Sequence, residues 1–450
     1  MRTVRIGEGS GFAGAWIEPA VELMEKGDLD YFSFEVLAER TLALAQMARA
    51  RDPDAGFDPF LEERFRAVLP AAVRRGIRIV TNGGSANPKG AAASVLRTAR
   101  GLGISKLRVA TVEGDDVRDL LAAGKYRTLE GDQALSELKD RIVSANAYLG
   151  ADPIVEALDA GADVVVTGRV TDSALALACL RHAFGWGPED WGLLAAGVMV
   201  GHLLECSTQI TGGYFSDPGY KDVSDLARIG YPIAEVAEDG TCLITKVVGS
   251  GGAVTEQTCK EQILYEVHDP HAYLTPDVSA DFSCVTCFQR AADEVVVSGA
   301  TGRTKPDHLK VSVGLRGGYI GEGQISYAGP NAVPRARLAA DIVRERLRMI
   351  DFSSEAIRFD LIGVDSVYGD SYADRHRAPA PPEVRLRVAA RTQSLQDAER
   401  IGREVEGLWV AGPAGGGGVS RQTREVISIV STLIEREAVR PRITVTEEAL

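Results

Sequence analysis

Residues 168–213, GRVTDSALALACLRHAFGWGPEDWGLLAAGVMVGHLLECSTQITGG, contain the pattern that decides the fold. They follow an apolar run at residues 162–166 that is typical of a buried strand. We expect Thr171 to cap a first helix and Asp172 to lie in its first turn, where a negative charge suits the helix dipole. A second helix, almost wholly apolar, is predicted over residues 192–206. A buried strand that leads into helices in this way is typical of an α/β fold.

Polar side chains appear abruptly at the end of the apolar helix. His202, Glu205 and Gln209 share one face, because positions three, four and seven apart lie together on a helix. We predict that Glu205, assisted by His202, moves a proton in catalysis, and that Asp172 is a third catalytic residue. Burial is expected to raise the pKa of Glu205 and to lower that of His202, which brings both near neutral pH. The alternative is that Glu205 only caps or pairs at a domain interface.

Length and composition exclude several classes of protein. A chain of 450 residues is expected to form two or three domains, and its net charge of -13 argues against binding to nucleic acid or to an anionic membrane. No apolar run reaches the ~20 residues of a membrane span, and the N-terminus lacks the apolar core of a signal peptide. The expected location is therefore the cytoplasm. The Cys284-x-x-Cys287 pair is interpreted as two core thiols rather than as zinc ligands.

Strands alternate with glycine-rich turns and helices through residues 1–213, which predicts an α/β domain with a parallel sheet and flanking helices. Ligands of such sheets bind beyond the carboxyl ends of the strands, where backbone N–H groups suit an anion. The strand-end residues that we predict to bind substrate in one crevice are Gly9, Ser10, Gly11, Asn82, Gly83, Gly84, Asn87 and Arg169. Gln209, in the turn after the apolar helix, is predicted to join them.

Some charged residues at the strand ends allow two interpretations. Arg169 is expected to hold a substrate carboxylate, since its planar fork suits bidentate binding. A structural pair with Asp172 explains Arg169 equally well. Glu35 and Glu39, four residues apart, are interpreted as a solvated or dipole-facing pair.

Residues 214–450 predict a second domain, β-rich and mixed α+β, in which short strand-like runs are separated by Gly, Pro and Asp turns. Lys246, which precedes one glycine turn, is a further candidate for substrate binding. Near the C-terminus the run GPAGGGG is expected between a strand and a helix. We interpret its Gly415, Gly416 and Gly417 as a nest for an anion or a carboxylate rather than as a flexible linker.

Short phrases along the whole chain carry a resemblance: GEGSGF, TNGGSANP, GADVVVTGRVTDSAL, GHLLECSTQITGG and WVAGPAGGGG. Together they resemble the acyclic terpene utilisation (AtuA) family. The resemblance implies a pathway that degrades branched terpenoid or other small carboxylic acids, often as CoA thioesters. It also implies a small partner subunit of roughly a hundred residues. The chain departs from the family pattern at Ala15 and Trp16, where an Asp-Arg pair is expected, and this favours a less charged or more apolar ligand.

The functional hypothesis is a lyase of the hydratase or dehydratase type that acts on a branched carboxylic acid or its CoA thioester. This chemistry needs a base, an acid and donors that stabilise an enolate. A divalent metal could replace the acid, although no metal-ligand motif is clear. The alternative is the substrate-binding large subunit of a two-component complex, inactive without its small partner. A homo-oligomer is expected, because the apolar helix at residues 192–204 would suit an interface.

An NAD-dependent oxidoreductase is not favoured. In the first glycine turn, Gly7 and Gly9 match a dinucleotide fingerprint, but Phe12 occupies the position of its third glycine. A ligand sensor is not favoured either, since the sequence holds no DNA-binding or signalling segment.

Overall fold

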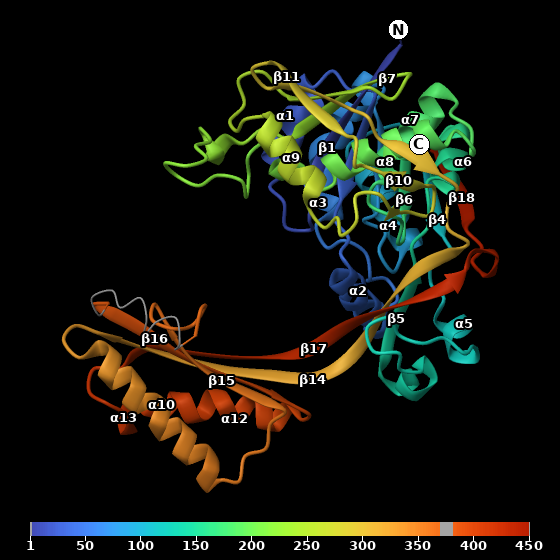
Figure 1. The fold of residues 1–450 in the computed structure, drawn as a ribbon. Helices are drawn as coiled ribbons and strands as arrows, with labels where there is room; N and C mark the ends of the chain where they lie inside the picture. The colour runs from blue at the N-terminus through green and yellow to red at the C-terminus, as the bar shows by residue number, and fades with distance from the viewer. Residues whose placement is uncertain (1, 370–380, 450) are drawn as a thin grey trace. The chain divides into compact units, whose positions relative to one another are not determined.

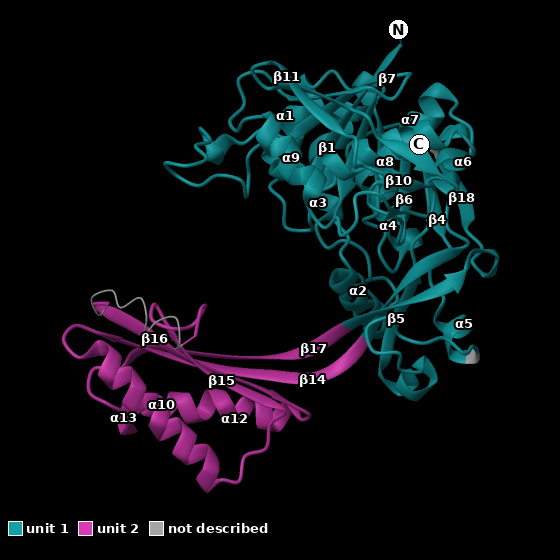
Figure 2. Ribbon diagram, in the orientation of Figure 1, with its two compact units in different colours: residues 1–314, 429–450 teal, residues 315–428 magenta. Residues whose placement is uncertain are grey.

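The computed structural model describes residues 2–369 and 381–449 (Figure 1). The described chain divides into two compact units: unit 1 comprises residues 1–314 and 429–450, and unit 2 comprises residues 315–428 (Figure 2). The predicted α/β class is confirmed, because helices cover a large sheet with a parallel centre and further antiparallel sheets follow it.

The main sheet of unit 1 has ten strands, and its central strands are parallel. In spatial order these are β1 (Thr3–Gly11), β2 (Tyr31–Glu35), β3 (Arg78–Thr81), β6 (Val164–Thr167) and β4 (Lys106–Glu113). Strands buried on both faces read as continuous apolar runs, and every residue of the Val-Val-Val-Thr strand β6 is buried. The carboxyl ends of these parallel strands lie along one edge of the sheet.

Antiparallel strands extend the sheet on both sides. Beyond β1 lie β7 (Pro232–Ala237), β8 (Cys242–Lys246), β12 (Glu294–Ser298) and β11 (Thr286–Ala291), and beyond β4 lies β18 (Arg442–Ala449). The domain boundary predicted after residue 213 lies inside unit 1, because β7 and β8 continue the sheet that begins before it.

Two helical layers cover the parallel strands. On one face α1 (Glu18–Lys26), α3 (Leu61–Arg75) and α4 (Pro88–Gly101) pack together over an apolar core that includes Phe32 and Val164. The other layer consists of α6 (Asp152–Asp159), α7 (Ala174–Phe184) and α8 (Trp191–Leu204), which pack in that order against one another and against the sheet.

The predicted apolar helix is confirmed as α8, and residues 194–204 are buried inside unit 1. This burial accounts for the apolar sequence, so α8 no longer argues for an oligomer. The cap predicted for the preceding helix is wrong: α7 begins after Ser173, and the Thr171 hydroxyl donates to the Leu149 carbonyl at 3.3 Å. The reason is a β-bridge between Leu149 and Val170, which ties this part of the chain to the neighbouring segment, so that a turn at Asp172 and Ser173 precedes the helix.

The remaining elements of unit 1 lie around this frame. They are α2 (Glu39–Arg51), α5 (Arg118–Ala123), β5 (Ile142–Ala147), α9 (Glu256–Leu264), and a small sheet of β9 (Tyr273–Leu274), β10 (Ser279–Asp281) and β13 (Thr301–Arg303). The small sheet packs against α8. Cys284 lies exposed in the turn before β11 and Cys287 is half-buried, so the expectation of two core thiols is wrong for Cys284.

Unit 2 has its own core under an antiparallel sheet with the spatial order β15-β16-β14-β17. Along the chain its elements are β14 (His308–Ala328), α10 (Ala332–Met349), β15 (Ala356–Ile362), β16 (Glu383–Thr392), α12 (Leu395–Glu406), α13 (Leu408–Ala411) and β17 (Gly417–Glu435). This β-α-β-β-α-β order is the split βαβ arrangement, in which both long helices cover one face of the sheet.

The elements predicted around the last glycine run are wrong. A short helix, α13, precedes it and the long strand β17 follows it. The segment after Gly418 alternates apolar and polar residues and is rich in Val, Ile and Thr, which favours a strand over the predicted helix.

No helix among the described residues combines the length and the hydropathy that crossing a membrane requires. The cytoplasmic location stays a prediction.

Candidate functional site

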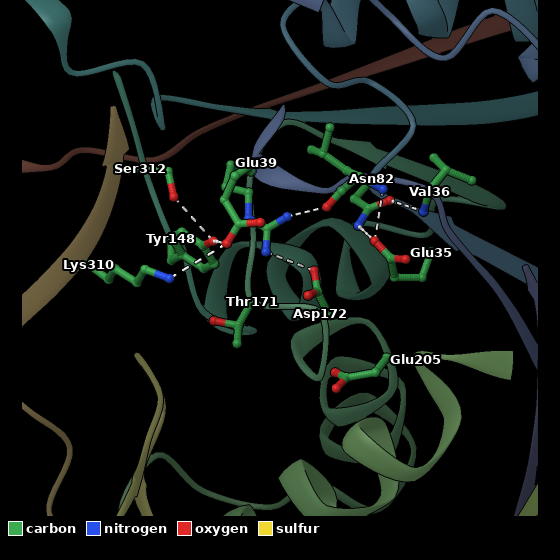
Figure 3. Close-up of polar contacts among 12 residues, drawn as sticks. Glu35, Val36, Glu39, Asn82, Tyr148, Thr171, Asp172, Glu205, Lys310 and Ser312 are labelled. Atoms are coloured by element: carbon green, nitrogen blue, oxygen red, sulfur yellow. Dashed lines mark hydrogen bonds and ion pairs between the residues drawn. The ribbon is translucent and has the colours of Figure 1, made fainter. Parts of the chain in front are cut away.

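Residues at the carboxyl ends of the parallel strands β2, β3 and β6 meet in one hydrogen-bonded cluster in unit 1 (Figure 3). Asn82, after β3, joins two of these strand ends: its Nδ2 donates to Glu35 Oε1 at 2.9 Å, and its Oδ1 accepts from the Val36 N–H at 2.9 Å. The Leu37 N–H also donates to Glu35 Oε1, at 2.8 Å. Glu35 is buried, so the interpretation of this residue as solvated is wrong. It is the last residue of β2, and the strand directs it to the same edge as Asn82.

Arg169, after β6, lies at the centre of the cluster with only 2% of its side chain exposed. Its Nη2 donates to Asp172 Oδ1 at 3.0 Å, and its Nη1 donates to the Leu37 carbonyl. The guanidinium stacks on the Tyr148 ring, 4.1 Å from the ring centroid. The structural pair with Asp172 is therefore present. Most of the guanidinium is engaged in the protein, although its Nε has no partner among the described residues.

The backbone of Arg169 is held by the residue that follows β4. Asp115 accepts the Arg169 N–H at 2.9 Å and an Asn146 Nδ2 donor at 2.8 Å. Burial raises the pKa of Asp115 to about 6, and these two donors only partly oppose the rise. Asp115 thus fixes the start of the segment that carries Arg169 and Asp172.

Carboxyl groups with raised and with lowered pKa values surround Arg169. Burial, with repulsion from Glu35 and Glu205, holds the pKa of Asp172 well above its usual range, although Arg169 opposes this. Burial likewise raises the pKa of Glu35. Glu39 behaves oppositely: the Tyr148 hydroxyl, Arg169 and Lys310 outweigh burial and lower its pKa to about 2. The cluster therefore places Asp172 and Glu35, whose pKa values are raised, close to Glu39, whose pKa is lowered.

His202 and Glu205 form the pair that the helical spacing predicts. His202 Nδ1 lies 2.7 Å from Glu205 Oε1, and the fully buried imidazole packs beside the rings of Tyr273 and Phe282, which stack on each other. The expected fall in the pKa of His202 is wrong. Burial lowers it, but the adjacent Glu205 carboxylate outweighs burial, and the pKa of His202 is raised.

A close helix contact brings this pair to Asp172. At Gly201, one residue before His202, an added Cβ would lie 2.5 Å from both the Ser173 Cα and the Ser173 carbonyl oxygen. Only a glycine lets the end of α8 approach the start of α7 this closely. The electrostatic coupling of Glu205 with Asp172 and Glu35 follows from this approach.

Gly201→Ala should therefore lower stability by about 1–3 kcal/mol through overpacking, although alanine is the better helix former. Gly192→Ala on the same helix is the matched control, because an added Cβ there meets nothing within 4 Å. We expect thermal melting to show a lower midpoint for Gly201→Ala and an equal or higher midpoint for Gly192→Ala. Equal behaviour of the two variants would contradict the close contact.

Glu8, on β1, is a buried acid that the sequence analysis missed. Its Oε1 accepts the Glu35 N–H at 2.9 Å, and the Ser33 hydroxyl donates to its Oε2. Burial raises the pKa of Glu8 to about 8, against these hydrogen bonds. Tyr273, on β9, is a second missed residue: burial and the charges of Glu205 and Asp172 raise its pKa, which keeps the hydroxyl protonated.

The predicted substrate-binding residues fall into two groups. Ser10 and Asn82 touch Glu35, with Ser10 Oγ donating to the Glu35 carbonyl at 2.6 Å. Gly11 and Gln209 line a cavity beside the cluster. The other predicted residues make contacts that support the fold. Gly9 packs on Phe32 and Phe34, Gly83 packs on Leu61, and Gly84 packs on the Thr167 carbonyl. Asn87 caps α4, and its Nδ2 donates to the Pro53 and Ala55 carbonyls.

Two further candidates lie elsewhere. Lys246, at the end of β8, is buried, pairs with Asp293 at 3.1 Å and donates to the Ser250 carbonyl at 2.8 Å. Gly415, Gly416 and Gly417 belong to unit 2: the first two lie between α13 and β17, and Gly417 begins β17.

A cavity of about 360 Å³ opens at the carboxyl end of β1, and we call it the β1 cavity. Its wall is formed by the end of β1, the loop at residues 12–16 and the segment at residues 206–214, with Ile229 and Tyr231. Ala15 and Trp16, the two residues that depart from the family pattern, are part of this wall.

Metal ligands are not grouped in the part of the chain that the structure describes: no three His, Cys, Asp or Glu side chains there could hold one ion together.

No curated protein and no solved structure matches the chain. The family described as acyclic terpene utilisation family protein AtuA matches residues 4–445, which is nearly the whole sequence. The match includes the strand ends that build the cluster and the loop that forms the β1 cavity. The resemblance of the short phrases is thereby confirmed, and the chain belongs to the acyclic terpene utilisation family, AtuA.

Proposed function

We propose that this chain is an enzyme of the hydro-lyase type, which adds or removes water at a branched carboxylic acid or its CoA thioester. The observation that carries the proposal is the His202–Glu205 pair, joined at 2.7 Å and coupled to an Asp172 whose pKa is well above the usual range. Dehydration requires a base and an acid, and a raised pKa suits a carboxyl group to the role of acid.

In the dehydration direction, Glu205 takes the proton from the carbon next to the carbonyl. The C–H electrons form the new C=C bond, and the C–O bond to the hydroxyl breaks as Asp172 donates its proton to the departing oxygen. The products are water and the unsaturated acid or thioester, and hydration is the reverse. His202 orients Glu205, and Arg169 orients Asp172.

An enolate formed in this step needs donors near the carbonyl oxygen. The Tyr273 hydroxyl, which stays protonated because burial and the charges of Glu205 and Asp172 raise its pKa, is the donor that we propose. Because carboxylates surround the acid and base, a neutral thioester suits the site better than a free carboxylate.

Family membership gives the chain a role in acyclic terpene utilisation. Acyclic terpenes have branched, apolar carbon chains, which agrees with the branched substrate that we propose. Homo-oligomer formation and a small partner subunit remain proposals that light scattering and co-purification would test.

Isotope exchange tests the reaction without knowledge of its direction. The protein is incubated in D₂O with branched 3-hydroxy acids, the matching unsaturated acids and the CoA thioesters of both. We expect enzyme-dependent deuterium at the carbon next to the carbonyl, detected by NMR, in one of these sets. A complete panel with no exchange and no change in hydroxyl content would contradict a hydro-lyase.

A further inference from the structure

The β1 cavity differs in chemistry from the cluster beside it. None of the described residues that line it is Asp, Glu, Lys, Arg or His, and its volume falls within the range of about 300–1,000 Å³ that small-molecule sites occupy. Three of its aromatic side chains reach far into solvent: Phe12 is 62% exposed, Trp16 is 59% exposed and Tyr214 is 92% exposed. Aromatic surface left open around an uncharged hollow marks a place for an apolar ligand.

The cavity adjoins the proposed base. Cys206 and Ser207, which directly follow Glu205, belong to its wall. Gly11 closes the gap between them and β1, since a Cβ there would lie 2.7 Å from the Cys206 carbonyl carbon. A ligand in the cavity therefore lies next to the turn that carries Glu205.

The wall of the β1 cavity also contains two residues with positive φ and one buried hydroxyl without a hydrogen bond, which packing alone does not explain. Ser207 and Tyr214 have φ values of 46° and 61°, in a region that residues with side chains rarely adopt. The Ser207 hydroxyl is buried and has no hydrogen-bond partner among the described residues. A buried hydroxyl without a hydrogen bond destabilises the folded protein, and a polar atom of a ligand would remove that cost. Rotation about χ1 is enough to redirect the hydroxyl. Strain and an unpaired polar group together are typical of a binding site.

We propose that the β1 cavity binds the apolar, uncharged end of the substrate, and that Trp16 and Ala15 determine this selectivity. The proposal rests on the proposed function for the identity of the substrate, but not for the existence of the site. The reacting end lies at Glu205 and Asp172, and the branched chain extends past Ser207 toward Phe12 and Trp16. A charged far end would have no counter-ion in this wall and would lose its hydration on entry.

The Trp16 loop is built to keep this surface in place. The Tyr231 hydroxyl donates to the Trp16 carbonyl at 2.6 Å, and the Ala15 N–H donates to the Phe12 carbonyl at 3.1 Å. The backbone of the loop is thus fixed while the Trp16 ring remains exposed. Substitution of the ring should therefore change binding and leave the fold intact.

Direct binding of unreactive probes tests the proposal. The first probe is 3,7-dimethyloctan-1-ol, a branched uncharged alcohol, and the second is the same chain with a carboxylate at its far end. We expect the first probe to bind the unaltered protein at least about tenfold more tightly, which corresponds to about 1.4 kcal/mol. Trp16→Ala should weaken it about tenfold, and Ala15→Asp should weaken it further by placing a charge in the wall.

The matched control is Trp409→Ala, because Trp409 is 65% exposed and belongs to unit 2. Tryptophan fluorescence and calorimetry both report binding, and thermal melting shows that each variant is folded. Trp16→Ala alone decides the outcome if Ala15→Asp does not fold. Equal affinity for the two probes, no binding of the alcohol, or equal effects of Trp16→Ala and Trp409→Ala would overturn the site.

The same experiment separates this site from the chemistry. The saturated alcohol lacks a carbonyl and cannot be hydrated or dehydrated, so its binding does not depend on Glu205 as a base. Selective binding without any isotope exchange would remove the hydro-lyase and keep the cavity. Isotope exchange without selective binding of the alcohol would keep the hydro-lyase and remove the proposed role of the β1 cavity.

Discussion

Glu205→Gln should reduce turnover of the true substrate by roughly 10²–10⁴-fold and leave the melting temperature unchanged. Glutamine keeps the shape of the side chain and its contact with His202 but accepts no proton at neutral pH. The Glu205 side chain is 11% exposed. Glutamine is uncharged and nearly the same size as glutamate, so the substitution adds no charge and little volume at this position. The turnover rates of the variant and of the unaltered protein are measured by product formation at fixed times, with the substrate that isotope exchange identifies.

The control for this variant is Glu261→Gln. Glu261 lies on α9, its side chain is 50% exposed, and it pairs only at the surface with Lys221. The Glu261→Gln protein should turn over the substrate at the rate of the unaltered protein. Normal turnover of Glu205→Gln, or loss of activity that follows unfolding, would make Glu205 a structural residue.

Glu8→Gln should make unit 1 more stable above neutral pH. The folded pKa of about 8 lies above the usual value of 4.5, so folding favours the protonated acid. The contribution of protonated Glu8 to the stability of the folded protein is complete below pH 4.5 and is lost as the pH rises through about 8. The full cost at high pH is of the order of 5 kcal/mol, and glutamine avoids it because it resembles the protonated acid.

Urea unfolding at pH 5 and at pH 8.5 measures this effect. The unaltered protein should lose stability between the two, helped by Asp115 and Asp277, because burial raises both of their pKa values to about 6. The Glu8→Gln protein should lose less. Glu25→Gln is the control of opposite sign, since Arg74 lowers the pKa of Glu25, and this variant should gain nothing at pH 8.5. An unchanged pH dependence in Glu8→Gln would contradict the buried, protonated acid.

The part of the site that depends on local spacing was predictable from the sequence. His202 and Glu205 lie three residues apart on one helix, so their contact follows from helical geometry. Asn82 and Arg169 follow parallel strands, and the edge that such strands share brings both to the same cluster. The apolar pattern of α8 likewise identified a buried helix.

Other parts depend on contacts between distant segments. Glu35 looks like a surface residue in the sequence, because its burial comes from Asn82, 47 residues away. Glu39 has its low pKa from Tyr148 and Lys310, which reach it from the segment after β5 and from β14. The extent of unit 1 was not predictable either, since β7 and β18 join its sheet from remote parts of the chain.

The course of β14 and β17 has a consequence for how this protein could have arisen. Each strand begins in one unit and ends in the other, and the two are neighbours in one sheet. Entry to and exit from residues 315–428 are therefore adjacent, and this segment has a core of its own. A single genetic insertion or deletion at that point would add or remove a complete domain without reordering the strands on either side. A shortened chain that joins Gly314 to Ile429 through a brief turn would be the minimal ancestor, and the proposed catalytic residues would all remain in it.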